Sequence, residues 1–244
     1  MRKGTTPAGA DTEEQAARWV RSMFGRIAPR YDRLNHLLSL NIDRLWRART
    51  VRRVEDVLAR RDARVLDLCC GTGDLTLALE TRRGGAVYGS DFCHPMLIAA
   101  GDKTRRRRLG SRFFESDALR LPLRDASLDL ITVAFGFRNL VDYRGGLAEL
   151  LRVLKPGGMA AILEFSQPPN RAFAALYGFY SLRVLPLLGG WLSGSRDAYA
   201  YLPESVKKFP GAAELASVMS HCGFSKVEFE RMTGGIVALH LGTR

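Results

Sequence analysis

The sequence predicts an α/β fold with a Rossmann-like, doubly wound and mostly parallel sheet. Stretches with strand character alternate with helical or loop stretches, which is the pattern of parallel strands covered by helices. The first strand ends in a glycine-rich turn that opens a helix, as in nucleotide-binding sheets. A length of 244 residues with 46% hydrophobic content suits one domain with a sizeable core. The expected parallel strands are 64–69, 86–90, 111–115, 128–134 and 159–165.

A single domain over 1–244 is expected, and helices precede the alternating pattern. Helical periodicity appears at 12–25 and 43–60, and Asp43 is expected to cap the second helix. A third helix at 143–154 ends at a Lys-Pro-Gly-Gly turn. The expected parts are a disordered tail at 1–11, N-terminal helices at 12–62, a cofactor-binding core at 63–166, an insertion at 167–209 and the end of the core at 210–244.

The insertion at 167–209 interrupts the alternation before the last helix. Its apolar segment 172–194 approaches the length of a membrane span, but Arg183 and the Gly189-Gly190 pair argue against a simple one. We expect a lid that packs on the core, an apolar entrance for a greasy substrate, or both. The stretches 225–231 and 235–242 are predicted to form a final hairpin, which brings the sheet to seven strands.

The turn after the first strand predicts a nucleoside-containing cofactor. Gly71 and Gly73 allow a ligand to lie against bare backbone at the N-terminus of a helix. Asp91 ends the second strand about 20 residues later, where a carboxylate suits a pair of ribose hydroxyls. A dinucleotide fingerprint needs a third glycine, and Thr76 stands in its place.

The acid-then-glycine order of this turn resembles motif I of the class I S-adenosylmethionine methyltransferases. Asp67 ends the strand, and a carboxylate is favourable near a sulfonium and an ammonium but unfavourable near phosphates. The resemblance implies S-adenosyl-L-methionine as the cofactor. It also implies a sheet that ends in an antiparallel strand.

The strongly basic composition leaves three interpretations open. The net charge is +12, and the sharpest cluster is the run 103–108 at the end of a predicted helix. A solvated helix end is favoured, and peripheral contact with an anionic membrane comes second. Nucleic acid is disfavoured, because no aromatic residues interleave with the run.

Cysteine spacing and the N-terminal sequence indicate the cell compartment in which the protein is expected. The cysteines show no disulfide framework and no metal-binding spacing, so no metal site is expected. No apolar signal-peptide core stands near Met1. A cytoplasmic protein is predicted, with association to a membrane left open.

Two polar residues stand in an otherwise apolar loop after the fourth strand. Arg138 and Asn139 are expected to face the reacting group, because ligands of open sheets bind at the carboxyl ends of strands. An arginine there can stabilise an oxyanion. The structural alternative is an arginine paired with Asp142. The loop lacks the Asn-Pro-Pro-aromatic motif of methyltransferases that act on exocyclic amines of bases.

Longer motifs resemble the ubiquinone/menaquinone biosynthesis C-methyltransferase family. The resemblance runs from about residue 24 to 242, and in two positions the chain departs from it. Asp43 stands where the family commonly has histidine and Leu34 where it has methionine, so no general-base role is carried over to position 43. The matching segments are 31–46, 135–139, 152–166, 201–205, 209–211 and 233–235.

The resemblance implies carbon methylation of a prenylated quinol, with demethylmenaquinol as the expected substrate and menaquinol as the product. A class I methyltransferase for another small molecule or for RNA is the alternative. Benzoquinol versus naphthoquinol, prenyl length, the general base and a homodimer stay open. For Asp117 a turn aspartate is the alternative role. The implied catalytic residues are Arg138 and Asn139, the cofactor contacts are Asp67, Gly71, Thr72, Gly73, Asp91, Asp117 and Ala118, and the substrate contacts are Tyr31, Asn35, Phe135 and Tyr201.

Overall fold

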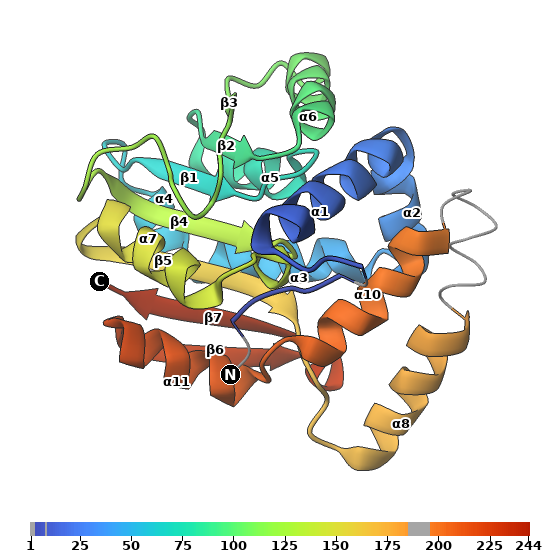
Figure 1. Ribbon diagram of the computed structural model, residues 1–244. Coiled ribbons are helices and arrows are strands. Elements are labelled where there is room, and N and C mark those ends of the chain that lie inside the picture. Colours follow the sequence, from blue (N-terminus) through green and yellow to red (C-terminus); the bar gives the residue numbers. More distant parts are fainter. Residues whose placement is uncertain (1–2, 8, 185–195) are drawn as a thin grey trace.

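The centre of the structure is a seven-stranded sheet in the order β3-β2-β1-β4-β5-β7-β6 (Figure 1). The computed structural model describes residues 3–7, 9–184 and 196–244. Strands β1 to β5 pair in parallel, whereas β7 runs antiparallel to both β5 and β6. The predicted doubly wound sheet and its final hairpin are confirmed. The strands are β1 (Val65–Leu68), β2 (Tyr88–Asp91), β3 (Arg112–Glu115), β4 (Leu128–Ala134), β5 (Leu154–Phe165), β6 (Ser225–Met232) and β7 (Val237–Thr243).

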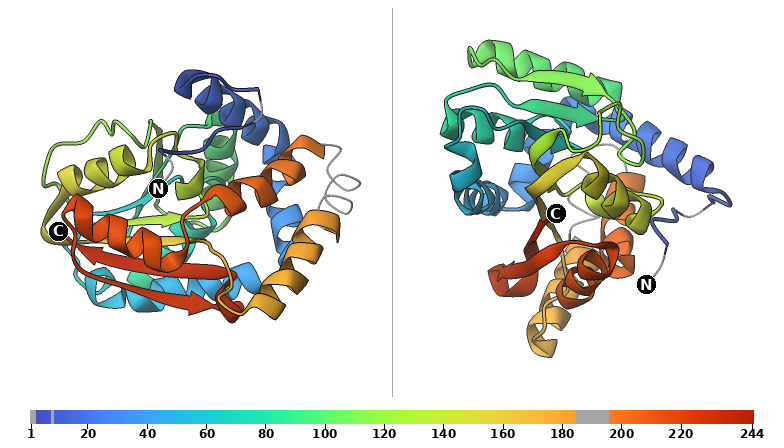
Figure 2. Two further views of the ribbon diagram at one scale, coloured as in Figure 1. Left: turned by 60° about the horizontal axis from the view of Figure 1, so that its bottom comes forward. Right: turned by 90° about the vertical axis from the view of Figure 1, so that its left-hand side faces the viewer.

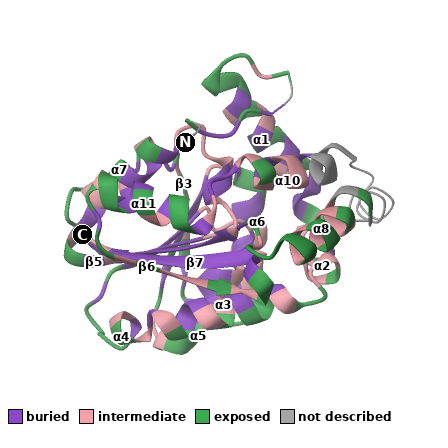
Figure 3. Cartoon of the chain, turned by 90° about the horizontal axis from the view of Figure 1, so that it is seen from below, coloured by how far each residue is buried: buried purple, intermediate pink, exposed green. Residues whose placement is uncertain are grey.

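Helices cover both faces of the sheet (Figure 3). Because side chains alternate along a strand, Leu66 and Leu68 of β1 pack toward α7 and α11, whereas Val65 packs toward α3, α4 and α5. The helices are α1 (Glu13–Ile27), α2 (Tyr31–Leu38), α3 (Ile42–Arg53), α4 (Glu55–Leu58), α5 (Asp74–Arg83), α6 (His94–Arg106), α7 (Tyr143–Val153), α8 (Arg171–Phe179), α10 (Arg196–Lys208) and α11 (Ala212–Cys222).

Two expected boundaries change in the structure. β5 begins at Leu154 rather than at 159, because Leu128 already pairs with Leu154 ahead of an irregularity in the β4–β5 register. The predicted helix at 43–60 divides into α3 and α4 at Val54. Neither change moves the carboxyl end of a strand.

Residues 3–5 are docked on the core, so this part of the chain does not form the expected disordered tail. The backbone amide of Thr5 donates to the carbonyl of Leu140 at 2.8 Å, and that of Tyr143 donates to Lys3 at 2.7 Å. Thr5 is buried, with 3% of its surface exposed. Residues 3–5 therefore run along the loop that follows β4.

The insertion begins with α8, which projects from the sheet beside α2 and α10 (Figure 2). A π-helical turn at Tyr180–Val184 follows it, and the remainder of the apolar segment 172–194 lies outside the described residues. Leu176 and Phe179 are 65% and 64% exposed. Among the described residues, no helix is both long and apolar enough to span a bilayer.

Candidate active site

A cavity of about 470 Å³ opens at the carboxyl ends of β1, β2 and β4. Helix α1 forms a further wall, so the N-terminal helices complete a site that the sheet begins. This is the place where ligands of open α/β sheets bind. Arg138, Asn35, Gly73 and Tyr201 are not among the lining residues. The predicted residues that do line it are Tyr31, Asp67, Gly71, Thr72, Asp91, Asp117, Ala118, Phe135 and Asn139.

The glycine turn takes the backbone conformation that its sequence predicts. Gly71 and Gly73 have φ angles of 54° and 83°, in the left-handed region that favours glycine. The amide of Gly71 donates to Asp91 Oδ2 at 2.9 Å. A Cβ on Gly73 would lie 3.1 Å from the Cβ of Ala100, so Gly73 allows α5 and α6 to pack closely. Gly71 therefore lines the cavity, whereas Gly73 contributes to the shape of the turn without lining the cavity.

Asp91 presents a buried carboxylate to the cavity. Its two oxygens accept the amides of Cys93 and Gly71, each at 2.9 Å. Burial raises the pKa of Asp91, against the opposing effect of these amides. Each carboxylate oxygen can accept a second hydrogen bond. Asp91 is therefore able to take two further donors from a ligand.

Asp117 lines the cavity just beyond β3 and serves its own turn as well. Its Oδ1 accepts the amide of Leu119 at 2.9 Å, so the turn role proposed as an alternative is present. Both Asp117 and Ala118 still line the cavity. The two roles are compatible, because the carboxylate has further acceptor capacity.

Asp67 is a buried acid of the cavity wall, on the interior strand β1. It is 1% exposed and accepts the hydroxyls of Thr76 at 2.6 Å and Thr132 at 2.8 Å. Burial raises the pKa of Asp67 to about 6, against the opposing effect of the two hydroxyls. A carboxylate held by hydroxyl groups in a dry site suits a positively charged ligand group.

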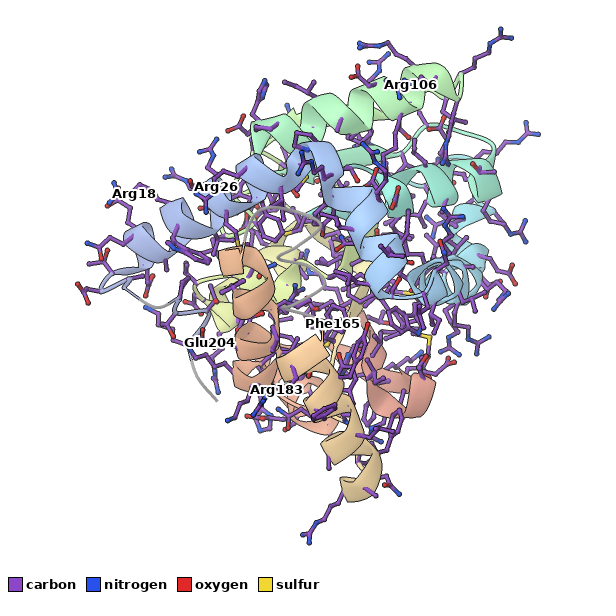
Figure 4. All side chains as sticks on the ribbon, turned by 90° about the vertical axis from the view of Figure 1, so that its right-hand side faces the viewer. Arg18, Arg26, Arg106, Phe165, Arg183 and Glu204 are labelled. Atoms are coloured by element: carbon purple, nitrogen blue, oxygen red, sulfur yellow. The ribbon has the colours of Figure 1, made fainter. Side chains whose placement is uncertain are left out.

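A charged network that the sequence does not reveal supports the glycine turn. Thr72 Oγ1 donates to Asp32 at 2.5 Å and accepts from Lys103 at 3.0 Å. Lys103 Nζ also lies 2.7 Å from Asp32 and 2.6 Å from Asp74. The basic run 103–108 therefore divides, because Lys103 points inward while Arg105–Arg108 are exposed. Figure 4 shows Arg106 at the outer end of α6.

Asp43 is a network residue and not the helix cap that its position suggests. The N-cap of α3 is Asn41, and no side-chain hydrogen bond caps that helix. Asp43 is 4% exposed and accepts from Ser39 Oγ at 2.7 Å. His36 Nδ1 lies 2.8 Å from Asp43 Oδ2, and Arg47 pairs with the same oxygen.

His36, Asp43 and Asp74 bring three potential metal-ligand atoms within 4.8 Å of one another. The cations Arg47 and Lys103 already bind the two carboxylates of this group. The charge that a metal ion would compensate is thus met by side chains of the chain itself.

Arg138 is a buried arginine and its guanidinium does not line the cavity. It is 6% exposed, and its Nη1 donates to Glu164 Oε1 at 3.0 Å and to the carbonyl of Phe135. Glu164 on β5 takes the role expected of Asp142, which instead caps α7 by accepting from Gly145 at 3.0 Å. The Arg138–Glu164 pair fixes the loop after β4.

Asn139 is the polar residue of this loop that reaches the cavity. Its Oδ1 accepts from the hydroxyl of Tyr201 at 3.1 Å, and that hydroxyl lies 2.7 Å from Thr5 Oγ1. The sequence analysis misses Thr5, since a polar residue near a chain end carries no signal of burial. Tyr201 therefore holds Asn139 from behind.

Aromatic side chains form the apolar part of the wall. The centroid of the Phe135 ring lies 4.8 Å from that of the Phe165 ring and 5.8 Å from that of the Trp46 ring. Tyr31 lines the cavity, and Asn35 hydrogen-bonds its hydroxyl from outside. Burial raises the pKa of Tyr31, against the opposing charges of Arg138 and Arg47. Among the predicted substrate residues, Tyr31 and Phe135 meet the cavity directly.

Comparison with known proteins gives a consistent match. The model of the ubiE/COQ5 methyltransferase family matches residues 10–244. The demethylmenaquinone methyltransferase of Thermus thermophilus is 51% identical over 91% of this chain and 100% of its own length. The enzyme of the same name from Deinococcus radiodurans is 46% identical over 92% of each chain. A ubiquinone/menaquinone biosynthesis C-methyltransferase of Idiomarina loihiensis is 41% identical over 91% of this chain and 89% of its own.

Solved structures share the fold at low sequence identity. A SAM-dependent methyltransferase of Thermotoga maritima, described as a possible histamine N-methyltransferase, superposes with a TM-score of 0.64 at 19% identity, over 91% of this chain and 98% of its own. A SAM-dependent methyltransferase of Aquifex aeolicus gives 0.55 at 22% identity, over 74% and 81%. These likenesses support the class I methyltransferase fold.

Proposed function

This chain belongs to the ubiE/COQ5 methyltransferase family, and from that premise we propose that it methylates a ring carbon of demethylmenaquinol to give menaquinol. The observation that supports demethylmenaquinol as the substrate is the 51% identity to the Thermus thermophilus demethylmenaquinone methyltransferase over the whole of that protein. Relatives near 40% identity carry either this name or the double ubiquinone/menaquinone name. The proposal therefore favours the naphthoquinol over the benzoquinol.

The residues that line the cavity fit S-adenosylmethionine. When bound, this cofactor supplies a methyl group on a positively charged sulfonium. Asp91 has spare acceptor capacity for the two ribose hydroxyls, and Asp117 with Ala118 lies where the adenine would be held. Asp67 and the turn at Gly71 and Thr72 then face the amino-acid end. The buried acid at that end suits the cationic groups of the ligand.

The loop after β4 is proposed to act on the quinol. A phenol has a pKa near 10, so the protein must stabilise the phenolate whose neighbouring carbon is methylated. Asn139 lines the cavity, and the bond from Tyr201 to its Oδ1 leaves its amide N–H groups for the quinol oxygen. Arg138 is proposed to act on the quinol indirectly. It fixes the loop that carries Asn139, and its buried positive charge stabilises the phenolate. This assignment moves the direct contact from Arg138 to Asn139.

Aromatic residues are proposed to place the ring. Phe135 and Tyr31 present flat, half-buried rings in the cavity, and in-line placement of the reacting atoms supplies several kcal/mol of the barrier, on the order of 7 or more when alignment is complete. Tyr201 and Asn35 are positioning residues, because they contact Asn139 and Tyr31 rather than the cavity.

Product analysis tests the function directly. The full chain is incubated with labelled S-adenosylmethionine and chemically reduced demethylmenaquinone, beside reduced benzoquinones, and the extracted lipid is examined by mass spectrometry. We expect label on the naphthoquinol ring. Label on a benzoquinol alone would replace the proposed substrate, and no label on either would refute the proposed activity.

We further propose that α8 and the end of α2 rest on an anionic membrane that holds the prenylated substrate. Leu176 and Phe179 of α8 are exposed, as are Leu37 and Leu40 near the end of α2. Tyr180 donates to the carbonyl of Leu38 at 2.9 Å, so the two elements adjoin. The exposed Arg183, in the π-helical turn that follows α8, adds the charge that attracts anionic lipid (Figure 4).

Vesicle sedimentation tests the membrane contact. The Leu176→Ser/Phe179→Ser variant is expected to bind vesicles that contain anionic lipid several-fold less than the natural chain. Ile98→Ser is the matched control, because Ile98 is 56% exposed on α6. Equal binding by both variants, or none by the natural chain, would remove this contact.

A further inference from the structure

Arg47 on α3 is a cation at the Asp67 end of the cavity. It lines the cavity, and 13% of its side chain is exposed. Its guanidinium carbon lies 5.6 Å from the centre of the Phe135 ring. Its charge is felt at the carboxyls of Asp67 and Asp74, where it opposes the effect of burial on their pKa values. The guanidinium therefore stands among the acids at this end, above the ring of Phe135.

Asp43 fixes one edge of this guanidinium. Arg47 Nη1 donates to Asp43 Oδ2, one turn earlier on the same helix. Asp43 is itself held by Ser39 and His36 at 2.7 and 2.8 Å. Among the described residues, Asp43 is the one hydrogen-bond partner of this side chain, so donors remain on the other edge of the rigid five-donor fork. The anchoring aspartate thus aims the free edge of the guanidinium.

The charges at this end match a zwitterion that carries one extra positive charge. The methionine end of S-adenosylmethionine has a sulfonium, an ammonium and a carboxylate. Asp67 is the buried acid for the cationic groups, and Arg47 is the cation beside it. The other arginines that line the cavity in the described part of the chain, Arg18 and Arg21, are on α1 and pair with Glu14 and Glu115.

We propose that Arg47, aimed by Asp43, binds the α-carboxylate of S-adenosylmethionine. The inference rests on the proposed function and adds a cofactor contact outside the glycine turn. It also accounts for an aspartate where the family resemblance expects a histidine. The Asp43 carboxylate accepts a charged hydrogen bond from Arg47, four residues later, and so fixes the position of that arginine.

Calorimetry with two ligands tests this contact. S-adenosylhomocysteine carries the carboxylate, and its decarboxylated analogue keeps the nucleoside, the thioether and the ammonium. The natural chain is expected to bind S-adenosylhomocysteine more tightly. In Arg47→Met its affinity should fall about 10- to 100-fold, the range for a charged hydrogen bond, while that of the decarboxylated analogue stays unchanged.

Two further variants separate this role from a structural one. Arg52→Met removes an exposed cation of the same helix, outside the cavity lining, and should weaken neither ligand. Arg47→Lys keeps the charge and should lose less affinity for S-adenosylhomocysteine than Arg47→Met. If Arg47→Met does not melt cooperatively, the comparison is made with Arg47→Lys instead. Equal losses for both ligands, or none, would overturn the inference. Failure of the natural chain to bind S-adenosylhomocysteine would instead overturn the proposed cofactor.

Discussion

The two sides of the cavity, which we propose hold the cofactor and the substrate, are built in different ways. The cofactor side takes its acids from 67–117, where neighbouring parallel strands end at one edge of the sheet. The substrate side joins segments that are distant in sequence, since Thr5 and Tyr201 are 196 residues apart. The comparison teaches that a local motif builds one side, whereas packing of the whole chain builds the other.

The largest expected effect comes from the buried ion pair of the substrate side. Arg138→Ala leaves Glu164 buried without its cation, which costs about 3–5 kcal/mol of unfolding free energy. We expect most turnover to be lost while the folded variant keeps its affinity for S-adenosylhomocysteine. Urea unfolding and calorimetry measure the two quantities.

The double variant Arg138→Ala/Glu164→Ala is the control for this pair. Because it removes both charges, it should be less destabilised than the sum of the single variants. Turnover that is unchanged in Arg138→Ala would remove the arginine from the reaction. A parallel loss of cofactor affinity would show that the two sides are not independent.

On the cofactor side, Asp91→Ala should lower the affinity for S-adenosylhomocysteine by roughly 100-fold, because two hydroxyls lose a charged acceptor. Asp117→Ala should lower it by only about 10-fold, because one amino group is involved. Calorimetry on both variants gives the ranking. The reverse ranking would move the ribose away from Asp91.

Asp67 makes the cofactor side sensitive to pH. Its pKa in the folded protein is raised to about 6, so folding takes up a proton there. Stability from this group is present below the unfolded pKa near 3.9 and is lost as the pH rises through about 6. Relative to the natural chain, Asp67→Asn should therefore be more stable at pH 7.5 than at pH 4.5, by about 2 kcal/mol. A difference that does not vary with pH would contradict the raised value.

The smallest effect is expected from Thr5. Thr5→Val removes one neutral hydrogen bond to Tyr201, worth about 1 kcal/mol of unfolding free energy, and loosens Asn139. Turnover should fall several-fold with unchanged affinity for S-adenosylhomocysteine. Thr6→Val is the control, because Thr6 is exposed. Equal turnover in the two variants would show that the docked segment does not position the site.

The sequence was a better guide to the cofactor side for a physical reason. Parallel strands end at one edge, so Asp67, Asp91 and Asp117 converge once the strands are recognised. Lys103 shows the limit of this reasoning. A charge run predicts solvent, but Lys103 shares the face of α6 that carries the buried Ala100 and Thr104, and it turns toward Asp74.

The substrate side needed contacts that no local pattern contains. Arg138 stands in a loop, and its partner Glu164 becomes adjacent only when β5 pairs with β4. Asp142 was the nearer acid in sequence, yet it caps α7. Asn139 was identified correctly as a polar residue of the cavity wall, whereas its support by Thr5 and Tyr201 was not foreseen.

The position of β7, one strand in from the edge of the sheet, has a consequence for synthesis of the protein. β7 inserts between β5 and β6, and Thr233 at the tip of the β6–β7 hairpin accepts from Trp46 Nε1 at 2.8 Å. Trp46 packs on Phe135, so one wall of the cavity leans on a segment that leaves the ribosome late. Nascent chains that stop before residue 233 should bind the methyl donor poorly, so cofactor binding distinguishes chains in which this support is present.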